Sequence, residues 1–160
     1  MTRRLLGVTL DVALRSEGDP QRRSELLKDF GRVLVRVHGV APAELGSGDW
    51  LERFMGVVKV LNPLVDRGQL ERLRKARPKS TSPTLIHGDL FLDNVLTLEG
   101  RVTGLIDWAF ADVGDARFDV AVASREWSWG DWAAFAAGYG SSGRLGVSEE
   151  AFFVEVALLF

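Results

Sequence analysis

The sequence predicts a mostly helical α+β domain with a small β-hairpin at its middle. Apolar residues recur at helical spacing over most of the chain, whereas the strand-like segments are three short apolar runs between residues 84 and 106. A length of 160 residues is typical of one domain. The content of 46% apolar and 26% charged residues indicates a packed core rather than a disordered chain.

The N-terminal half is predicted to contain three helices, over residues 19–38, 49–61 and 64–77. Asp19 is a suitable cap for the first helix, and Pro20 suits its first turn. The second helix opens at Asp49 and ends at the pair Asn62-Pro63, because the residue before a proline disfavours helical geometry. The polar segment 78–83 then links this half to the strands.

Three strands follow, over residues 84–86, 95–98 and 102–106. The last two are joined by a tight turn at Glu99-Gly100 and form a hairpin. Helical spacing returns after Asp115, and three more helices are predicted, over residues 117–127, 131–139 and 148–160.

Composition excludes several classes of protein. The chain has no cysteine, so it holds no disulfide framework, thiolate zinc site or iron–sulfur cluster. Its apolar runs are shorter than the ~18 residues of a membrane span, and Asp11 interrupts the apolar N-terminal stretch, unlike in a signal peptide. The net charge of −2 argues against a nucleic-acid partner. We therefore expect a cytoplasmic protein with neither a nucleic-acid nor a membrane partner.

Acidic residues concentrate around the hairpin. Residues 84–119 contain seven acidic side chains and two arginines, a local charge of −5. The two ends of a hairpin lie together, so Asn94 at the start of one strand and Asp107 at the end of its partner should be neighbours. Asp89 lies on the loop that leads to the same end. Oxygen donors of this kind suit Mg²⁺, and a carboxylate off the metal suits a general base.

An alternative explanation applies to individual members of this set. Asp and Asn are common at turns and helix caps, where they bond to nearby backbone groups. For Asp93, Asp112 and Asp115, taken singly, capping or solvation is the favoured interpretation. The set Asp89, Asn94 and Asp107 is interpreted as a catalytic site.

The segments HGDLFLDNVL (87–96) and GLIDWAFADVGDARFDVA (104–121) resemble the aminoglycoside phosphotransferase and choline kinase superfamily. The pattern of that superfamily is HGDxxxxN, a hairpin, IDW or IDF, then GD and DxA. LFLDNVL also resembles bacterial homoserine kinases of the same superfamily. The resemblance implies a protein-kinase-like C-terminal lobe, a single unit over residues 1–160 with its catalytic hairpin at 84–119.

The resemblance also implies a role for each matching residue. Asp89 corresponds to the catalytic aspartate that orients and deprotonates the acceptor hydroxyl. Asn94 and Asp107 correspond to the ligands of Mg²⁺, through which ATP is bound as the phosphate donor. His87 occupies a structural position of the catalytic loop, and Asp119 corresponds to an aspartate that braces this loop.

One part of the family pattern is missing. The family has an N-terminal ATP-binding lobe with a strand lysine, whereas none of the four lysines of this chain has a strand-like context. The segment 7–14 resembles the stretch just after the hinge between the lobes, so we expect this chain to lack the N-terminal lobe. Two alternatives to an active kinase lobe stay open. One is a non-catalytic lobe, a pseudoenzyme or binding module, and the other is a lobe completed by a partner chain or a dimer.

The expected reaction is phosphotransfer from ATP to a small-molecule hydroxyl, such as that of an aminoglycoside, choline or homoserine. The negative charge of the site favours a cationic acceptor. Homoserine also remains a candidate acceptor, because a zwitterion carries a positive and a negative charge and can bind groups of either sign. Three tryptophans, Trp127, Trp129 and Trp132, either line a substrate pocket or bind a cation, or else belong to the core or an interface. A place in the core is the favoured interpretation. The GxGxxG spacing at 138–143 follows a helical pattern rather than a strand, so it is interpreted as a connection between helices.

Overall fold

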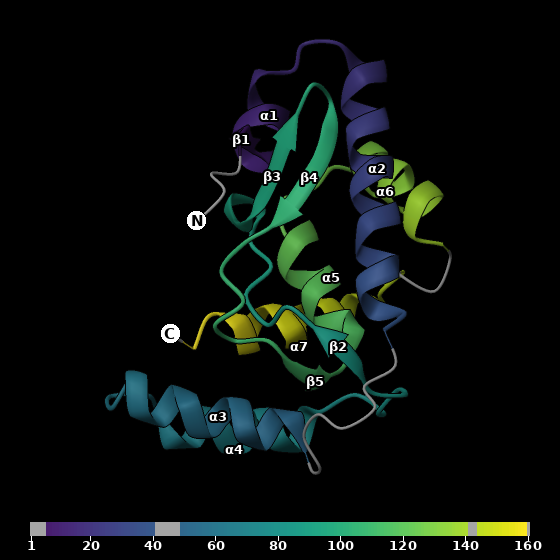
Figure 1. Ribbon diagram of the computed structural model, residues 1–160. Helices are drawn as coiled ribbons and strands as arrows, with labels where there is room; N and C mark the ends of the chain where they lie inside the picture. The colour runs from purple at the N-terminus through teal and green to yellow at the C-terminus, as the bar shows by residue number, and fades with distance from the viewer. Residues whose placement is uncertain (1–5, 41–48, 141–143, 160) are drawn as a thin grey trace.

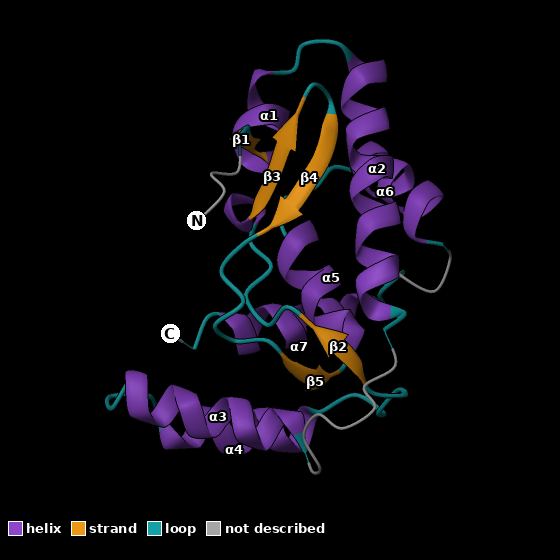
Figure 2. Ribbon diagram, in the orientation of Figure 1, coloured by secondary structure: helices purple, strands orange, loops and turns teal. Residues whose placement is uncertain are grey.

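A computed structural model describes residues 6–40, 49–140 and 144–159. Its N-terminal half contains β1 (Val8–Thr9), α1 (Leu10–Ser16), α2 (Pro20–His38), α3 (Trp50–Leu61) and α4 (Arg67–Ala76). The middle contains β2 (Thr84–Ile86), the short 3-10 helix η1 (Leu92–Asn94), β3 (Val95–Leu98), β4 (Arg101–Leu105) and β5 (Asp112–Gly114). The last elements are α5 (Ala116–Ser124), α6 (Trp129–Tyr139) and α7 (Val147–Ala157). The mostly helical α+β class is confirmed (Figure 2).

The helices begin where their capping residues predict. The Asp19 side chain accepts a hydrogen bond from the Gln21 N–H at 2.9 Å, and Asp49 does the same for the Leu51 N–H at 3.0 Å. These bonds satisfy amide groups that have no partner within the helix. The final helix starts one residue earlier than predicted, at Val147.

The hairpin of β3 and β4 is confirmed, with its turn at Glu99-Gly100. Two strands were not predicted from the sequence. β1 pairs antiparallel with β3, so the hairpin belongs to a three-stranded sheet, and β5 pairs antiparallel with β2. β1 and β5 each contain a single apolar residue, Val8 and Val113, so neither shows the apolar run that indicated β2.

The core is divided into two clusters, and α5 lies between them (Figure 1). One cluster joins α5 to α3, α4 and α7, and includes Phe118. The other joins α5 to α1, α2, α6 and the hairpin, and includes Val120. Because residues 118–124 are all buried, a polar side chain on this helix must find its partners inside the protein.

Close contact between α2 and α6 requires two glycines. A Cβ atom at Gly138 would lie 1.9 Å from the Lys28 carbonyl oxygen, and one at Gly31 would lie 2.4 Å from the Phe135 carbonyl oxygen. Gly138 is therefore a packing residue within α6, so the connection between helices that was expected at 138–143 starts only after Tyr139. Residues 141–143 of that motif lie outside the described residues.

In the part of the chain that the structure describes, no helix has both the length and the apolar character needed to span a membrane.

Candidate active site

Asp119 on α5 organises the loop that leaves β2. Its side chain is fully buried. One carboxylate oxygen accepts the His87 backbone N–H at 2.7 Å, and the other accepts the Gly88 N–H at 3.0 Å. The carboxylate thus satisfies two buried amides that would otherwise have no partner. The sequence-based expectation was that Asp119 braces this loop, and these are the contacts through which it can do so.

Asp119 is also contacted by His38 of α2, which in turn contacts Tyr139 of α6. The His38 Nε2 lies 3.1 Å from an Asp119 carboxylate oxygen, and its Nδ1 lies 2.6 Å from the Tyr139 hydroxyl. Burial raises the pKa of Tyr139 to about 12, so its hydroxyl keeps its proton at neutral pH. Sequence analysis assigned neither residue to the site, because α2 and α6 are brought to Asp119 only by tertiary packing.

His87 ties the same loop to the end of β4. It is fully buried, and its Nε2 donates a hydrogen bond to the Ile106 carbonyl at 2.8 Å. A carbonyl only accepts, so Nε2 carries a proton and Nδ1 is free to accept the Asp89 N–H at 3.4 Å. The ring also packs against Trp108, with centroids 4.6 Å apart. These contacts account for both ring nitrogens, which fits a structural role.

Gly88 makes the turn between His87 and Asp89 possible. Its φ is +82°, and a Cβ atom there would lie 2.0 Å from the Phe110 carbonyl oxygen. Only glycine adopts this conformation without strain and without that clash.

Asp89 and Asn94 are in direct contact. The Asn94 side-chain amide donates to the Asp89 carbonyl oxygen at 2.8 Å and to its carboxylate at 3.1 Å. Burial raises the pKa of Asp89 above its ordinary value, and the charges of Asp107 and Asp119 raise it further. The hydrogen bond from Asn94 and the nearby His87 act in the opposite direction. Asp89 is therefore a half-buried carboxyl group with an increased affinity for protons.

Asp107 lies at the same end of the hairpin. The Ile106 N–H donates to the Asn94 carbonyl oxygen at 2.9 Å, which brings the end of β4 beside Asn94. Asp107 has a φ of +60°, a left-handed conformation that is uncommon for a residue with a side chain. Its side chain is exposed. The convergence of the hairpin ends that the sequence predicted thus occurs: Asn94 contacts Asp89 and is bonded to Ile106, the residue directly before Asp107.

Two other acidic residues of this region have structural partners. Asp112 forms a bidentate ion pair with Arg53 at 2.8 and 2.9 Å. Asp115 caps α5 through the Arg117 N–H and also pairs with the Arg117 guanidinium at 2.6 Å. The cap made by Asp115 agrees with the alternative interpretation, whereas Asp112 is neither a helix cap nor simply solvated but pairs with an arginine of α3. Both ion pairs also neutralise part of the negative charge counted in the sequence.

The surface around Asp89 contains two neighbouring hollows. A narrow one of about 10 Å³ is lined by Phe54, Gly88, Asp89, Phe91, Phe118, Val122 and Ala157. The second has a volume of about 140 Å³ and shares Phe91 and Val122 with the first. We call the second hollow the Arg125 pocket, because Arg125 is one of the residues that line it.

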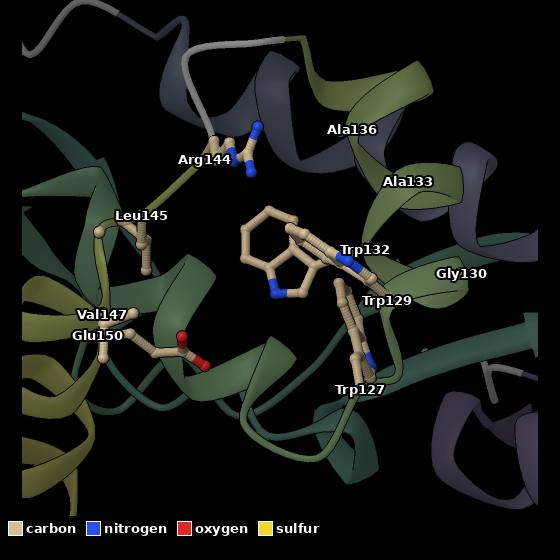
Figure 3. A pocket seen from close by; sticks show the side chains of 11 residues that line it. Trp127, Trp129, Gly130, Trp132, Ala133, Ala136, Arg144, Leu145, Val147 and Glu150 are labelled. Carbon is tan, nitrogen blue, oxygen red and sulfur yellow. The ribbon is translucent and has the colours of Figure 1, made fainter.

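A larger pocket of about 950 Å³ lies between α6 and the start of α7 (Figure 3). Trp127, Trp129 and Trp132 all line it, as the substrate-pocket interpretation required. The core interpretation also holds in part, since Trp127 and Trp132 pack against the cluster around α2 and α6. Trp129 is 75% exposed.

The mostly helical lobe, with the loop of residues 87–94 that leads from β2 to the hairpin, has the fold of a kinase-like phosphotransferase. The sequence profile of the APH family, described as the phosphotransferase enzyme family, matches residues 1–152. The chain belongs to this family.

Solved structures of the same fold include an aminoglycoside-3'-phosphotransferase of type VIII, with a TM-score of 0.72 and 22% identity over 98% of this chain and 67% of that one. Another is the aminoglycoside phosphotransferase APH(3'')-Id of Streptomyces rimosus, with a TM-score of 0.70 and 20% identity over 96% of this chain and 66% of that one. This chain thus spans about two thirds of these structures.

Among curated proteins, the homoserine kinase of Methylocella silvestris is 37% identical over 67 residues, which are 42% of this chain and 21% of that protein. The homoserine kinase of Rhizobium etli is 41% identical over 61 residues, 38% of this chain and 19% of that protein. The matched stretch is therefore about a fifth of these relatives.

Proposed function

We propose that this chain is the catalytic lobe of a kinase that transfers the γ-phosphoryl group of ATP to a hydroxyl of a small molecule in the cytoplasm. The observation that carries the proposal is the contact of Asp89 with Asn94 on a loop that Asp119 holds through two backbone amides. A loop fixed in this way holds a reacting carboxylate in one orientation, which is the main requirement of phosphoryl transfer.

Asp89 is the proposed general base. Asp89 lines the narrow hollow, whose volume of about 10 Å³ is close to that needed by a single water molecule or hydroxyl group. Because burial raises its pKa, the carboxylate is a stronger proton acceptor than an exposed aspartate. Its hydrogen bond with Asn94 orients one oxygen and leaves the other to accept the proton of the hydroxyl.

Asn94 and Asp107 are the proposed ligands of Mg²⁺. The Asn94 amide nitrogen is used by Asp89, which leaves its side-chain oxygen as a metal ligand. The exposed Asp107 carboxylate supplies a second oxygen. Among the described residues, no group of three or more His, Asp or Glu side chains could hold a metal. This donor set fits Mg²⁺, which often binds one or two protein groups and otherwise water and phosphate oxygens. When bound, the ion would neutralise charge on the phosphates.

We also propose that residues 1–160 form one lobe that contacts ATP mainly through this metal site. The four lysines lie on α2, α3, α4 and the segment after α4, outside the sheet of β1, β3 and β4. A lysine that grips the phosphates would then come from elsewhere, such as a partner chain or the second copy in a dimer. The same observation favours the second candidate function, a non-catalytic lobe that keeps the fold.

Titration of Mg²⁺–ATP into this chain tests the proposal. We expect saturable binding that depends on Mg²⁺ and is lost in Asp107→Asn. Asp93→Asn is the matched control, because Asp93 is an exposed carboxylate on the same loop. Phosphotransfer to a panel of an aminosugar, choline and homoserine is then followed by ³¹P NMR, and Asp89→Asn should abolish it. Nucleotide binding that is absent, or equal in Asp107→Asn and the wild type, would favour the non-catalytic lobe.

A further inference from the structure

The Arg125 pocket differs from the rest of the acidic site because it carries charges of both signs. Three carboxylates and two guanidiniums lie around it, together with one aromatic ring: Asp11, Arg15, Phe91, Asp93, Arg125 and Glu126. Sequence analysis favoured a cationic acceptor, on the basis of acidic residues alone. The structure places two cations beside the loop that carries Asp89, which changes the expected charge of the acceptor.

Arg125 is the cation of this pocket that is best placed to bind a ligand. Its guanidinium lies over the Phe91 ring, 4.6 Å from the centroid, and its contact with Glu126 is long, at 3.7 Å. Arg15, in contrast, is paired with Asp11 at 2.8 Å. Packing on Phe91 holds the planar guanidinium in one orientation, and its N–H groups can then bind a carboxylate in a bidentate manner.

The size of the pocket also limits the acceptor. Its volume of about 140 Å³ is well below the roughly 300–1,000 Å³ of pockets for drug-sized ligands. A molecule the size of a single amino acid fits, and a multi-ring aminosugar does not. Phe91 follows Asp89 by two positions, lies under the Arg125 guanidinium and lines both hollows. A short ligand bound at Arg125 therefore lies next to the loop that carries Asp89.

The larger pocket, which Trp127, Trp129 and Trp132 line, has room for an aminosugar, but Arg144 and Glu150 together give its lining no net negative charge. The Arg144 guanidinium already lies over the Trp129 ring at 5.2 Å, the position that an ammonium group of a ligand would take (Figure 3). This pocket also has no lining residue in common with the hollow that contains Asp89.

We propose that the Arg125 pocket binds the amino-acid end of a small hydroxy amino acid, and that Arg125 receives its carboxylate. Asp93 and Glu126 then attract its ammonium group. The proposal rests on the proposed function, since it assigns the acceptor of that reaction. It makes Arg125 a specificity-determining residue, which selects a zwitterion over a purely cationic amine.

Calorimetric titration of the whole chain with three matched probes tests this assignment without any need for catalysis. L-Homoserine carries both charges, 3-aminopropan-1-ol lacks the carboxylate, and 4-hydroxybutanoate lacks the ammonium group. Arg125→Gln should weaken the binding of L-homoserine and 4-hydroxybutanoate by about tenfold or more, and should not weaken that of 3-aminopropan-1-ol, whose ammonium group Arg125 repels. Arg125→Lys, which keeps the charge, should recover part of the loss.

Arg144→Gln is the control, because it removes another exposed guanidinium that lies over an aromatic ring. It should leave all three affinities unchanged. The proposal is overturned if folded wild-type chain shows no saturable binding of L-homoserine up to tens of millimolar. Tighter binding of kanamycin than of L-homoserine, or equal affinities in the wild type and Arg125→Gln, would also overturn it. Phosphotransfer is assayed separately. Transfer to an aminosugar without L-homoserine binding refutes this inference alone, and L-homoserine binding without transfer refutes the proposed kinase activity alone.

Discussion

Asp119 offers the sharpest test of how this loop is held. In Asp119→Ala, the backbone N–H groups of His87 and Gly88 lose their acceptor inside the protein. Each buried amide left without a partner costs about 1–3 kcal/mol, so the free energy of unfolding should fall by roughly 2–6 kcal/mol. Domains of this kind are typically stable by about 5–15 kcal/mol, so a large part of the total would be lost.

Asp119→Asn separates the two bonds. The asparagine oxygen can accept only one of the two amides, and its NH₂ group then faces the other donor, so the loss should be about 1–3 kcal/mol. Urea unfolding followed by circular dichroism measures both values. Hydrogen exchange should show faster exchange at the amides of His87 and Gly88 than at the α5 backbone. Asp93→Asn, at an exposed carboxylate of the same loop, should change stability by less than about 0.5 kcal/mol. Equal effects of Asp119→Ala and Asp93→Asn would refute the argument.

Three further outcomes follow from the structure. Burial raises the pKa of Asp89 in the folded state, so ionisation of Asp89 destabilises the fold as the pH rises above the ordinary pKa of 3.8. Asp89→Asn should therefore increase stability at pH 7 but not below pH 3.8. Thermal melts across this pH range measure the difference. Gly138→Ala should lower the free energy of unfolding by several kcal/mol in urea, because the new Cβ would overlap a backbone carbonyl of α2. Gly56→Ala is the control: a Cβ at this position of α3 meets open space, so the free energy of unfolding should rise by roughly 0.5–1 kcal/mol. In Asp107→Gly, the free energy of unfolding should rise by about 1 kcal/mol, because glycine adopts the left-handed conformation without strain, and Mg²⁺-dependent ATP binding should be lost. Glu99→Gly, at the other left-handed residue, should gain similar stability and keep ATP binding.

Much of the fold could be predicted from local patterns. Helix α2 begins where the Asp19-Pro20 pair places its start, and the hairpin turns where Glu99-Gly100 predicts. Both features depend on residues that are adjacent in the sequence. The pairing of β1 with β3 was not predicted, because β1 has only two residues and its Val8 pairs with Thr97, 89 positions later. The same limit applied to β5, whose three residues pair with β2.

The site was predictable to the extent that the hairpin determines it. The closure of two strands brings Asn94 and Asp107 together, and the sequence contains that information. The contact of Asp119 with His38 could not be derived from the hairpin, because His38 lies on α2, 81 positions before Asp119. Arg125 was missed for a similar reason. Its relation to Phe91 depends on how the end of α5 packs against the loop, and nothing in the local sequence indicates that contact.

Asp89, Asp107 and Asp119 lie in three different environments, and these environments match the different roles proposed for them. Asp119 is fully buried, and backbone donors occupy both of its oxygens, so it is suited to hold the backbone of the loop. Asp89 is half-buried, and its raised pKa matches the proposed role in proton transfer. Asp107 is exposed and has a left-handed backbone conformation, which matches the proposed role in binding a cation from solvent. If these environments define the roles, exchanging Asp for Asn should damage stability at Asp119, proton transfer at Asp89 and metal-dependent binding at Asp107. A common effect at all three positions would show that negative charge alone, rather than environment, determines what this loop does.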